Sequence, residues 1–121
     1  MREKVRPMII RDSESDKVWT LEFSRDSVKF AEARGVSIDG VGNMPMTMLP
    51  ELFYSAFRKH HRNISKAETD KILFDELGGL TDAQYHRLMQ LFAEPMNTLI
   101  KDKDEDGGEV QENPKMVVEL D

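Results

Sequence analysis

The sequence predicts an α+β fold in which an N-terminal β-hairpin packs on a bundle of about four α-helices, followed by a disordered acidic C-terminal tail. Apolar side chains alternate at period two near the N-terminus, recur at helical spacing between residues 25 and 100, and become sparse after Ile100. A chain of 121 residues is long enough for one domain. We therefore expect a single α+β domain over residues 1–100 and a flexible tail over residues 101–121.

The hairpin is expected over residues 4–23. Residues 5–11 are rich in β-forming side chains, residues 12–16 form a polar turn cluster, and the following strand places Trp19, Leu21 and Phe23 on one face. Pro7 lacks the N–H that a central strand needs, so the first strand should be an edge. Because a two-stranded hairpin is marginal in water, helices or a partner's strand must cover its apolar face.

A first helix is expected over about residues 25–34, with Ser24 as its N-cap and Gly35 ending it. Its apolar positions are Val28, Phe30, Ala31 and Ala33. Residues 36–45 contain two glycines and an asparagine, which predicts a loop. We expect Ile38 to hold this loop against the core.

Three further helices are expected at about 47–61, 66–77 and 82–100. The first tolerates Pro50 within its opening turn and ends in a basic run, and capping boxes at Ser65 and Thr81 start the other two. Pro95 should kink the last helix near residues 91–93. The expected inward residues are Leu49, Leu52, Phe53, Ala56, Phe57 and His60; then Ile72, Leu73, Phe74 and Leu77; then Tyr85, Leu88, Met89, Phe92, Met96, Leu99 and Ile100.

The negative charge belongs to the tail. The whole chain has 17 basic and 23 acidic residues, a net charge of −6, whereas residues 101–121 alone have a net charge of −5. Residues 1–100 have 14 basic and 15 acidic groups and are nearly neutral. A long-range electrostatic attraction of the domain for nucleic acid is therefore not expected.

No catalytic, cofactor or metal site is expected. The chain has no cysteine, and the spacing of its only histidines, His60, His61 and His86, matches no zinc motif. No serine lies in a nucleophile elbow, and no phosphate-binding loop is present. No apolar run approaches the length that spans a bilayer and no secretory signal follows the N-terminus, so the expectation is an intracellular protein without membrane contact.

The methionines are the feature of the composition that points to a function. Of eight methionines, Met44, Met46 and Met48 lie within five residues, and flexible thioether side chains suit surfaces that adapt to varied apolar partners. Filling of the core or of a loop is the other interpretation. We expect partner contacts at Met44, Met46, Met48, Arg58 and Lys59, the last two from the basic run at 58–62.

The sequence resembles small tail assembly chaperones of long-tailed phages and prophages of Gram-positive bacteria. The similar segments span about residues 17–100; they are 19–32 (WTLEFSRDSVKFAE), 48–61 (MLPELFYSAFRKHH), 63–65, 69–72 and 91–100 (LFAEPMNTLI). The resemblance implies a gene between those of the tail tube and the tape measure. It implies a cytoplasmic protein that binds the tape measure protein, keeps it soluble, helps recruit tail-tube subunits and is absent from the finished virion.

Two other functions stay open at this point: a tail-completion or connector protein of the virion, and a small regulatory protein that binds nucleic acid through Arg58, Lys59 and Arg62. The oligomeric state is also open, because the edge of the hairpin could pair with another copy. The family resemblance further implies that a longer form made by ribosomal frameshifting is common among such chaperones.

Overall fold

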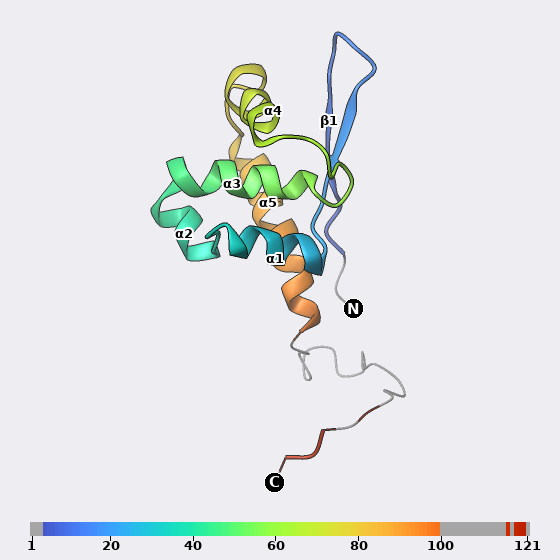
Figure 1. Ribbon diagram of the computed structural model, residues 1–121, viewed down its shortest axis with the longest axis vertical. Helices are drawn as coiled ribbons and strands as arrows, with labels where there is room; N and C mark the ends of the chain where they lie inside the picture. Colours follow the sequence, from blue (N-terminus) through green and yellow to red (C-terminus); the bar gives the residue numbers. More distant parts are fainter. Residues whose placement is uncertain (1–3, 100–115, 117, 121) are drawn as a thin grey trace.

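The structure is a computed structural model that describes residues 4–99, 116 and 118–120 (Figure 1). It confirms the α+β fold, with an antiparallel hairpin followed by helices. The elements in chain order are β1 (Met8–Arg11), β2 (Val18–Leu21), α1 (Arg25–Ala33), α2 (Ile38–Asn43), α3 (Pro45–Phe57), α4 (Lys66–Asp70), the π-helix η1 (Lys71–Glu76), α5 (Asp82–Ala93) and the 3₁₀ helix η2 (Glu94–Thr98).

The hairpin forms where the period-two pattern predicts it. Met8 lies opposite Leu21, and Ile10 lies opposite Trp19. The turn is held by Asp12, whose carboxylate accepts hydrogen bonds from the backbone N–H of Glu14 and the hydroxyl of Ser15, both at 2.9 Å. Short polar side chains favour turns through such local bonds, which explains why the polar cluster separates the two strands.

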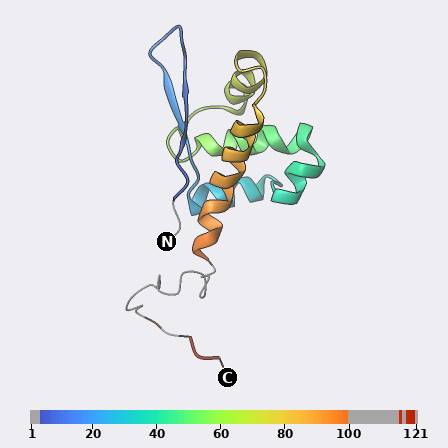
Figure 2. The same ribbon diagram turned by 180° about the vertical axis from the view of Figure 1, so that it is seen from behind.

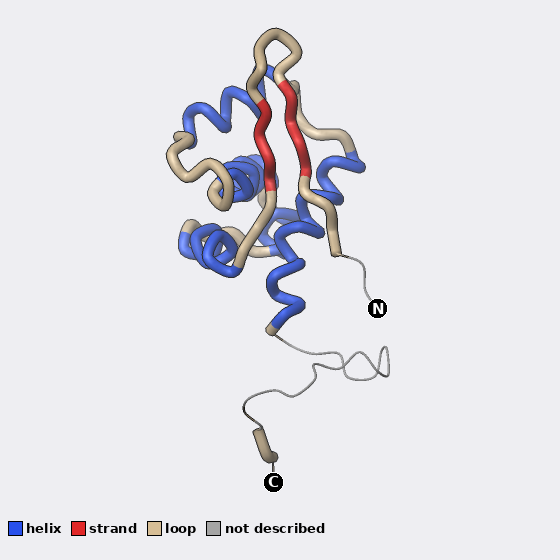
Figure 3. Tube along the Cα trace, turned by 90° about the vertical axis from the view of Figure 1, so that its right-hand side faces the viewer, coloured by secondary structure: helices blue, strands red, loops and turns tan. Residues whose placement is uncertain are grey.

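Helices cover the hairpin, as the marginal stability of an isolated hairpin requires. Figure 3 shows the two strands running along one side of the helices. The outer edge of β2 is tied to the end of α3, because the N–H of Thr20 donates to Nε2 of His61 and the N–H of Glu22 donates to the carbonyl of Ala56, both at 3.0 Å. Leu21 is fully buried between the strands and the helices.

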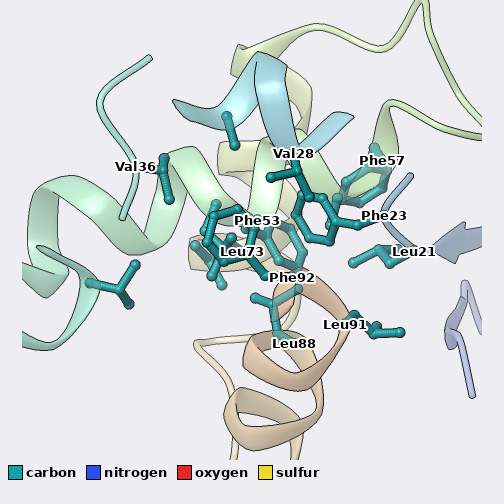
Figure 4. Packing of buried hydrophobic residues seen from close by; sticks show 14 of the residues in the cluster. Leu21, Phe23, Val28, Val36, Phe53, Phe57, Leu73, Leu88, Leu91 and Phe92 are labelled. Carbon is teal, nitrogen blue, oxygen red and sulfur yellow. The ribbon is translucent and has the colours of Figure 1, made fainter. Parts of the chain in front are cut away.

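The core gathers around α3. Leu52, Phe53 and Phe57 of this helix are fully buried, as the helical stripe predicts. Figure 4 shows the side chains of Phe53 and Phe57 meeting those of Phe23, after the hairpin, and Phe92, on α5. The rings of Phe23 and Phe92 lie edge to face at 5.2 Å between centroids. Burial of each such side chain contributes about 1.5–3 kcal/mol, so α3 is the element on which the others depend.

Local capping explains where three helices begin. Ser24, Ser65 and Thr81 each accept a hydrogen bond from the backbone N–H three residues on, and each forms a reciprocal capping box. Such a cap is worth about 1 kcal/mol. Gly35 has a φ of 93° just after α1, the left-handed conformation expected of a residue that ends a helix. Ala33 is exposed rather than inward, because a position two residues after the buried Ala31 lies about 200° further around the helix, on the opposite face.

The predicted loop over residues 36–45 is wrong, because it contains the helix α2. The Ser37 side chain caps α2 by accepting from the N–H of Gly40 at 2.9 Å. Val41 is 1% exposed and attaches the helix to the core, whereas Ile38 is 44% exposed and does not. Burial of one valine and a good cap outweigh the low helix propensity of Gly40 and Gly42.

The helix predicted over 47–61 starts earlier and ends earlier than expected. α3 begins at Pro45, whose missing N–H needs no partner at the first helical position. Pro50 therefore lies inside the helix, where it is buried, and not in the opening turn. The helix ends at Phe57, so Arg58 is its C-cap and the basic run forms the following turn. His60 is exposed rather than inward.

The helix predicted over 66–77 divides into α4 and the π-helix η1. The N–H of Leu77 donates to the carbonyl of Ile72, five residues back, at 2.8 Å. This wider turn changes the angular spacing of the side chains. Ile72 and Leu73 are buried as expected, but Phe74 and Leu77 are exposed. The predicted inward placement of these two residues is wrong for this reason.

The helix predicted over 82–100 changes type after Ala93. α5 ends at Ala93, and the tighter η2 follows with Pro95 in its first turn. The inward residues differ from the expected set at two positions. Leu91 is buried although it was not in that set, and Leu99 is exposed although it was. Ile100 and most of the predicted tail lie outside the described residues. Met116, Val118, Glu119 and Leu120 are described; they are exposed and have no regular secondary structure.

Candidate partner-binding surfaces

The backbone at the junction of α2 and α3 is fixed by hydrogen bonds around Met44. Its N–H donates to the carbonyl of Gly40 at 2.7 Å, and its carbonyl accepts from the N–H of Met48 at 2.9 Å. Met44 therefore ends one helix and begins the next, and its side chain is left 51% exposed. Met46 follows in the first turn of α3 and is 81% exposed.

Met48, the third methionine of the group, has a different role. It is partly buried and packs against the core cluster. A Cβ built on Gly40 would lie 3.6 Å from both Cγ and Sδ of Met48, so this side chain fills the space between α2 and α3. Both interpretations of the methionines therefore apply: Met48 fills the interior, whereas Met44 and Met46 face solvent.

Arg58 belongs to a stack of cationic and aromatic side chains on α1 and α3. Its guanidinium lies 4.1 Å from the ring centroid of Phe30, whose ring meets that of Tyr54 edge to face at 5.7 Å. On the other side, Arg34 lies 4.9 Å from the ring of Tyr54. A cation–π contact at such a site contributes about 0.5–1 kcal/mol, so Arg58 has a structural role within the domain.

Lys59 is tied to the hairpin through Glu22. Its Nζ lies 3.2 Å from Oε1 of Glu22, and Nε2 of His60 lies 2.9 Å from the same oxygen. Burial alone would raise the pKa of Glu22, but the hydrogen bonds from His60 and Lys59 outweigh it and hold that pKa below its ordinary value. The carboxylate therefore stays ionised and joins the end of β2 to the turn after α3.

The five residues expected to contact a partner do not form one surface. Met44, Met46 and Met48 lie at the start of α3, and Arg58 and Lys59 follow its end. A rise of 1.5 Å per residue puts about 18 Å between Met46 and Arg58. Figures 1 and 2 show the α2–α3 junction on the side of the fold away from the hairpin, with the end of α3 beside the hairpin. The exposed methionines and the basic pair are thus separate features.

Two sets of exposed apolar residues were not expected from the sequence. Ile38 lies at the start of α2, close in the chain to Met44 and Met46, and extends the apolar character of that junction. Phe74 and Leu77 are exposed on and just after η1. The cap residue Ser37 is a signal that could have indicated α2. We found no sequence signal for the π-helical turn that exposes Phe74.

Within the described residues, no group of three or more His, Asp or Glu side chains could hold a metal ion. The same part of the chain has no helix that combines the length and the apolar composition of a membrane span.

Comparison with curated proteins found no match, and neither did comparison with solved structures. A family described as a domain of unknown function (DUF5055) matches residues 1–119, which is nearly the whole chain. This protein therefore belongs to the DUF5055 family.

Proposed function

We propose that the protein is a tail assembly chaperone of a long-tailed phage or prophage. In this role it binds the tape measure protein, keeps it soluble and helps recruit tail-tube subunits, without catalysing a reaction. The resemblance over residues 17–100 supports the assignment. The structural observation that carries it is the pair of exposed methionines, Met44 and Met46, at the α2–α3 junction.

The chemistry of this junction suits an apolar helical client. Thioether side chains are flexible and polarisable, so they fit the irregular apolar stripe of a helix and tolerate changes in its sequence. Ile38 adds a branched aliphatic side chain nearby, and it too is about half exposed. A tape measure protein presents such stripes along its length, according to the family resemblance. We propose that the junction covers one of them.

The backbone that presents these side chains is held in place by hydrogen bonds and by contacts with the core. Ser37 caps α2, Met44 joins both helices through its backbone, and Val41 and Met48 attach the junction to the core. Fixed backbone with adaptable side chains lowers the entropy lost on binding while leaving a choice of clients. This combination supports a holding function better than it supports a single exact fit.

The regulatory nucleic-acid function receives less support from the contacts of the basic run. Arg58 stacks on Phe30 and Lys59 pairs with Glu22, so phosphate binding by either would compete with an internal contact. A domain that is nearly neutral also adds no long-range attraction.

Co-expression with the tape measure protein of the same genome tests the proposal. We expect the wild-type protein to raise the soluble yield of the tape measure protein and to co-purify with it. The double variant Met44→Ser/Met46→Ser should lose most of both effects, because it removes the apolar contact without changing charge. Phe74→Ser/Leu77→Ser is the matched control, since it removes exposed apolar side chains elsewhere and should behave as wild type.

Two results would contradict the proposal. One is a soluble yield that does not depend on the protein at all. The other is its presence in purified particles by mass spectrometry, which would favour a structural tail protein. A thermal unfolding measurement on each variant shows that a lost effect does not come from a lost fold.

A further inference from the structure

The outer edge of β1 has backbone groups available for pairing. The N–H groups of Thr20 and Glu22 point away from β1, toward His61 and Ala56. Thr20 lies opposite Ile9. In an antiparallel pair, the N–H and C=O groups of two opposite residues either both point toward the partner strand or both point away from it. The N–H and C=O of Ile9, and by the same alternation those of Arg11, therefore point away from β2. No described residue forms a further hydrogen bond with them.

The same edge is basic and short. Lys4, Arg6 and Arg11 lie in or just before β1, and residues 4–11 contain no acidic side chain. Pro7 would be the next outward-facing position, and its missing N–H limits the edge to the groups of Ile9 and Arg11. A short acidic strand would match this edge in both length and charge.

The C-terminal segment has the apolar spacing of a short strand and one acidic side chain, Glu119, and most of the acidic residues of the tail precede it in the chain. Met116, Val118 and Leu120 are spaced by two residues and are 84%, 83% and 90% exposed. Side chains at this spacing lie on one face of a strand, and Glu119 would lie on the other. Residues 101–121 have a net charge of −5, opposite in sign to the edge of β1. The family match extends to residue 119 and so includes most of this segment.

The chain is long enough to bring the two together. Seventeen residue steps separate Leu99 from Met116, and a chain of that length spans up to about 56 Å. Figures 1 and 3 show that β1 starts at the end of the hairpin nearer to η2, whereas the hairpin turn points away from η2. The guanidinium of Arg87 on α5 also contacts the carbonyl of Arg6 at 3.3 Å, which places the helix before η2 beside the chain that enters β1.

We propose that the segment containing Met116, Val118 and Leu120 adds to the outer edge of β1 of its own chain as a third strand. The three apolar side chains then continue the face formed by Met8 and Ile10, and Glu119 lies on the face of Arg11. The added strand covers an edge that would otherwise be open to aggregation or to pairing with other chains. This docking needs no client, so it stands apart from the role of the methionines.

Amide hydrogen exchange of the full chain, measured by NMR, tests the proposal. If the segment is docked about nine-tenths of the time, the Ile9 and Arg11 amides exchange about tenfold more slowly than in Met116→Ser/Val118→Ser/Leu120→Ser. The Ile10 amide, which faces β2, should exchange at the same rate in both proteins and reports that the fold is intact. Val110→Ser is the matched control, because it removes an apolar tail residue outside the segment, and it should retain the wild-type protection.

Equal exchange of Ile9 and Arg11 in the wild type and the triple variant would overturn the proposal. Protection that rises with protein concentration, together with a dimer in analytical ultracentrifugation, would also overturn the intrachain form and assign the edge to a second copy. Protection independent of concentration and lost only in the triple variant supports it.

Discussion

His61 connects the hairpin to the end of α3 through one ring nitrogen. Its Nε2 accepts the hydrogen bond from the N–H of Thr20, so the neutral ring with its proton on Nδ1 is the form that fits. Burial, followed by the nearby charge of His60, lowers the pKa of His61 from its ordinary value of 6.5. The hydrogen bond from Thr20 favours the same neutral form, since a protonated ring can no longer accept it.

This geometry predicts a loss of stability in mild acid. Because the pKa of His61 is lower in the folded than in the unfolded chain, the unfolded chain binds more protons below pH 6.5. The contribution of His61 is therefore complete above pH 6.5 and is lost as the pH falls through the folded pKa. Urea unfolding at pH 7.5, 6.5 and 5.5 should show this decline.

His61→Gln should show a smaller decline over the same pH range. The glutamine oxygen can still accept from Thr20 but does not titrate. His60 is present in both proteins, so the difference between them isolates His61. The exposed His86 provides the control, and His86→Gln should decline as the wild type does. An identical decline in His61→Gln would contradict the assignment.

The lowered pKa of Glu22 predicts a second loss of stability, at more acidic pH. Its pKa lies below the ordinary 4.5, because the bonds from His60 and Lys59 outweigh the effect of burial. Its stabilisation is present above pH 4.5 and is lost as the pH falls through the lowered pKa. Since both partners are partly exposed, Glu22→Gln should cost only about 0.5–1 kcal/mol at pH 7 and less at pH 3.5. Urea unfolding measures the cost, and Glu32→Gln, on the exposed face of α1, should cost less.

At the scale of elements, α2 shows how one buried side chain determines a helix. Val41 is its only buried residue, and Ile38 is its most conspicuous apolar one. Val41→Ala should lower the free energy of unfolding by about 2 kcal/mol, because it leaves a cavity where α2 meets the core. Ile38→Ala, on the same helix, should cost less than about 0.5 kcal/mol, since its side chain is half in solvent. Urea unfolding of both variants checks the contrast, and similar costs for the two would contradict it.

The elements predicted correctly are those determined by nearby residues. The caps at Ser24, Ser65 and Thr81 depend on bonds that span three residues, and the hairpin depends on alternation and a turn, so the sequence contains the necessary information. The errors occur where distant packing decides. Two glycines suggested a loop, yet burial of Val41 makes it a helix. The shift to π-helical bonding at residue 77 left no periodic signature.

The candidate site, like the helices and strands, could be predicted from the sequence only in part. Clustering of Met44, Met46 and Met48 in sequence correctly located an exposed apolar region, but not that Met48 packs inward. That distinction depends on where α2 lies, and α2 was missed. Arg58 and Lys59 were chosen for their charge alone. Their partners, Phe30 and Glu22, lie more than 25 residues away in the chain and could not be identified from the local sequence.

For the whole molecule, the distribution of charge limits what can hold a partner. The net charge of −6 resides mostly in residues 101–121, and residues 1–100 have a net charge of −1. Arg58 and Lys59 are already engaged within the domain. Under the proposed function, a partner bound by the body of the protein is held mainly through apolar contact, and such contact depends only weakly on salt.

This conclusion predicts how binding responds to salt. If Met44 and Met46 hold the client, its affinity should change less than about threefold between 50 and 500 mM NaCl, because screening acts on charges and not on apolar contact. Binding of nucleic acid through Arg58, Lys59 and Arg62 would instead release about three counterions, so affinity would fall about 500-fold over the same range. Titration of the protein with a fluorescent client segment, and separately with duplex DNA, distinguishes the two. A steep loss of client affinity with salt would mean that the partner is held by charge and that the methionines are not the main contact.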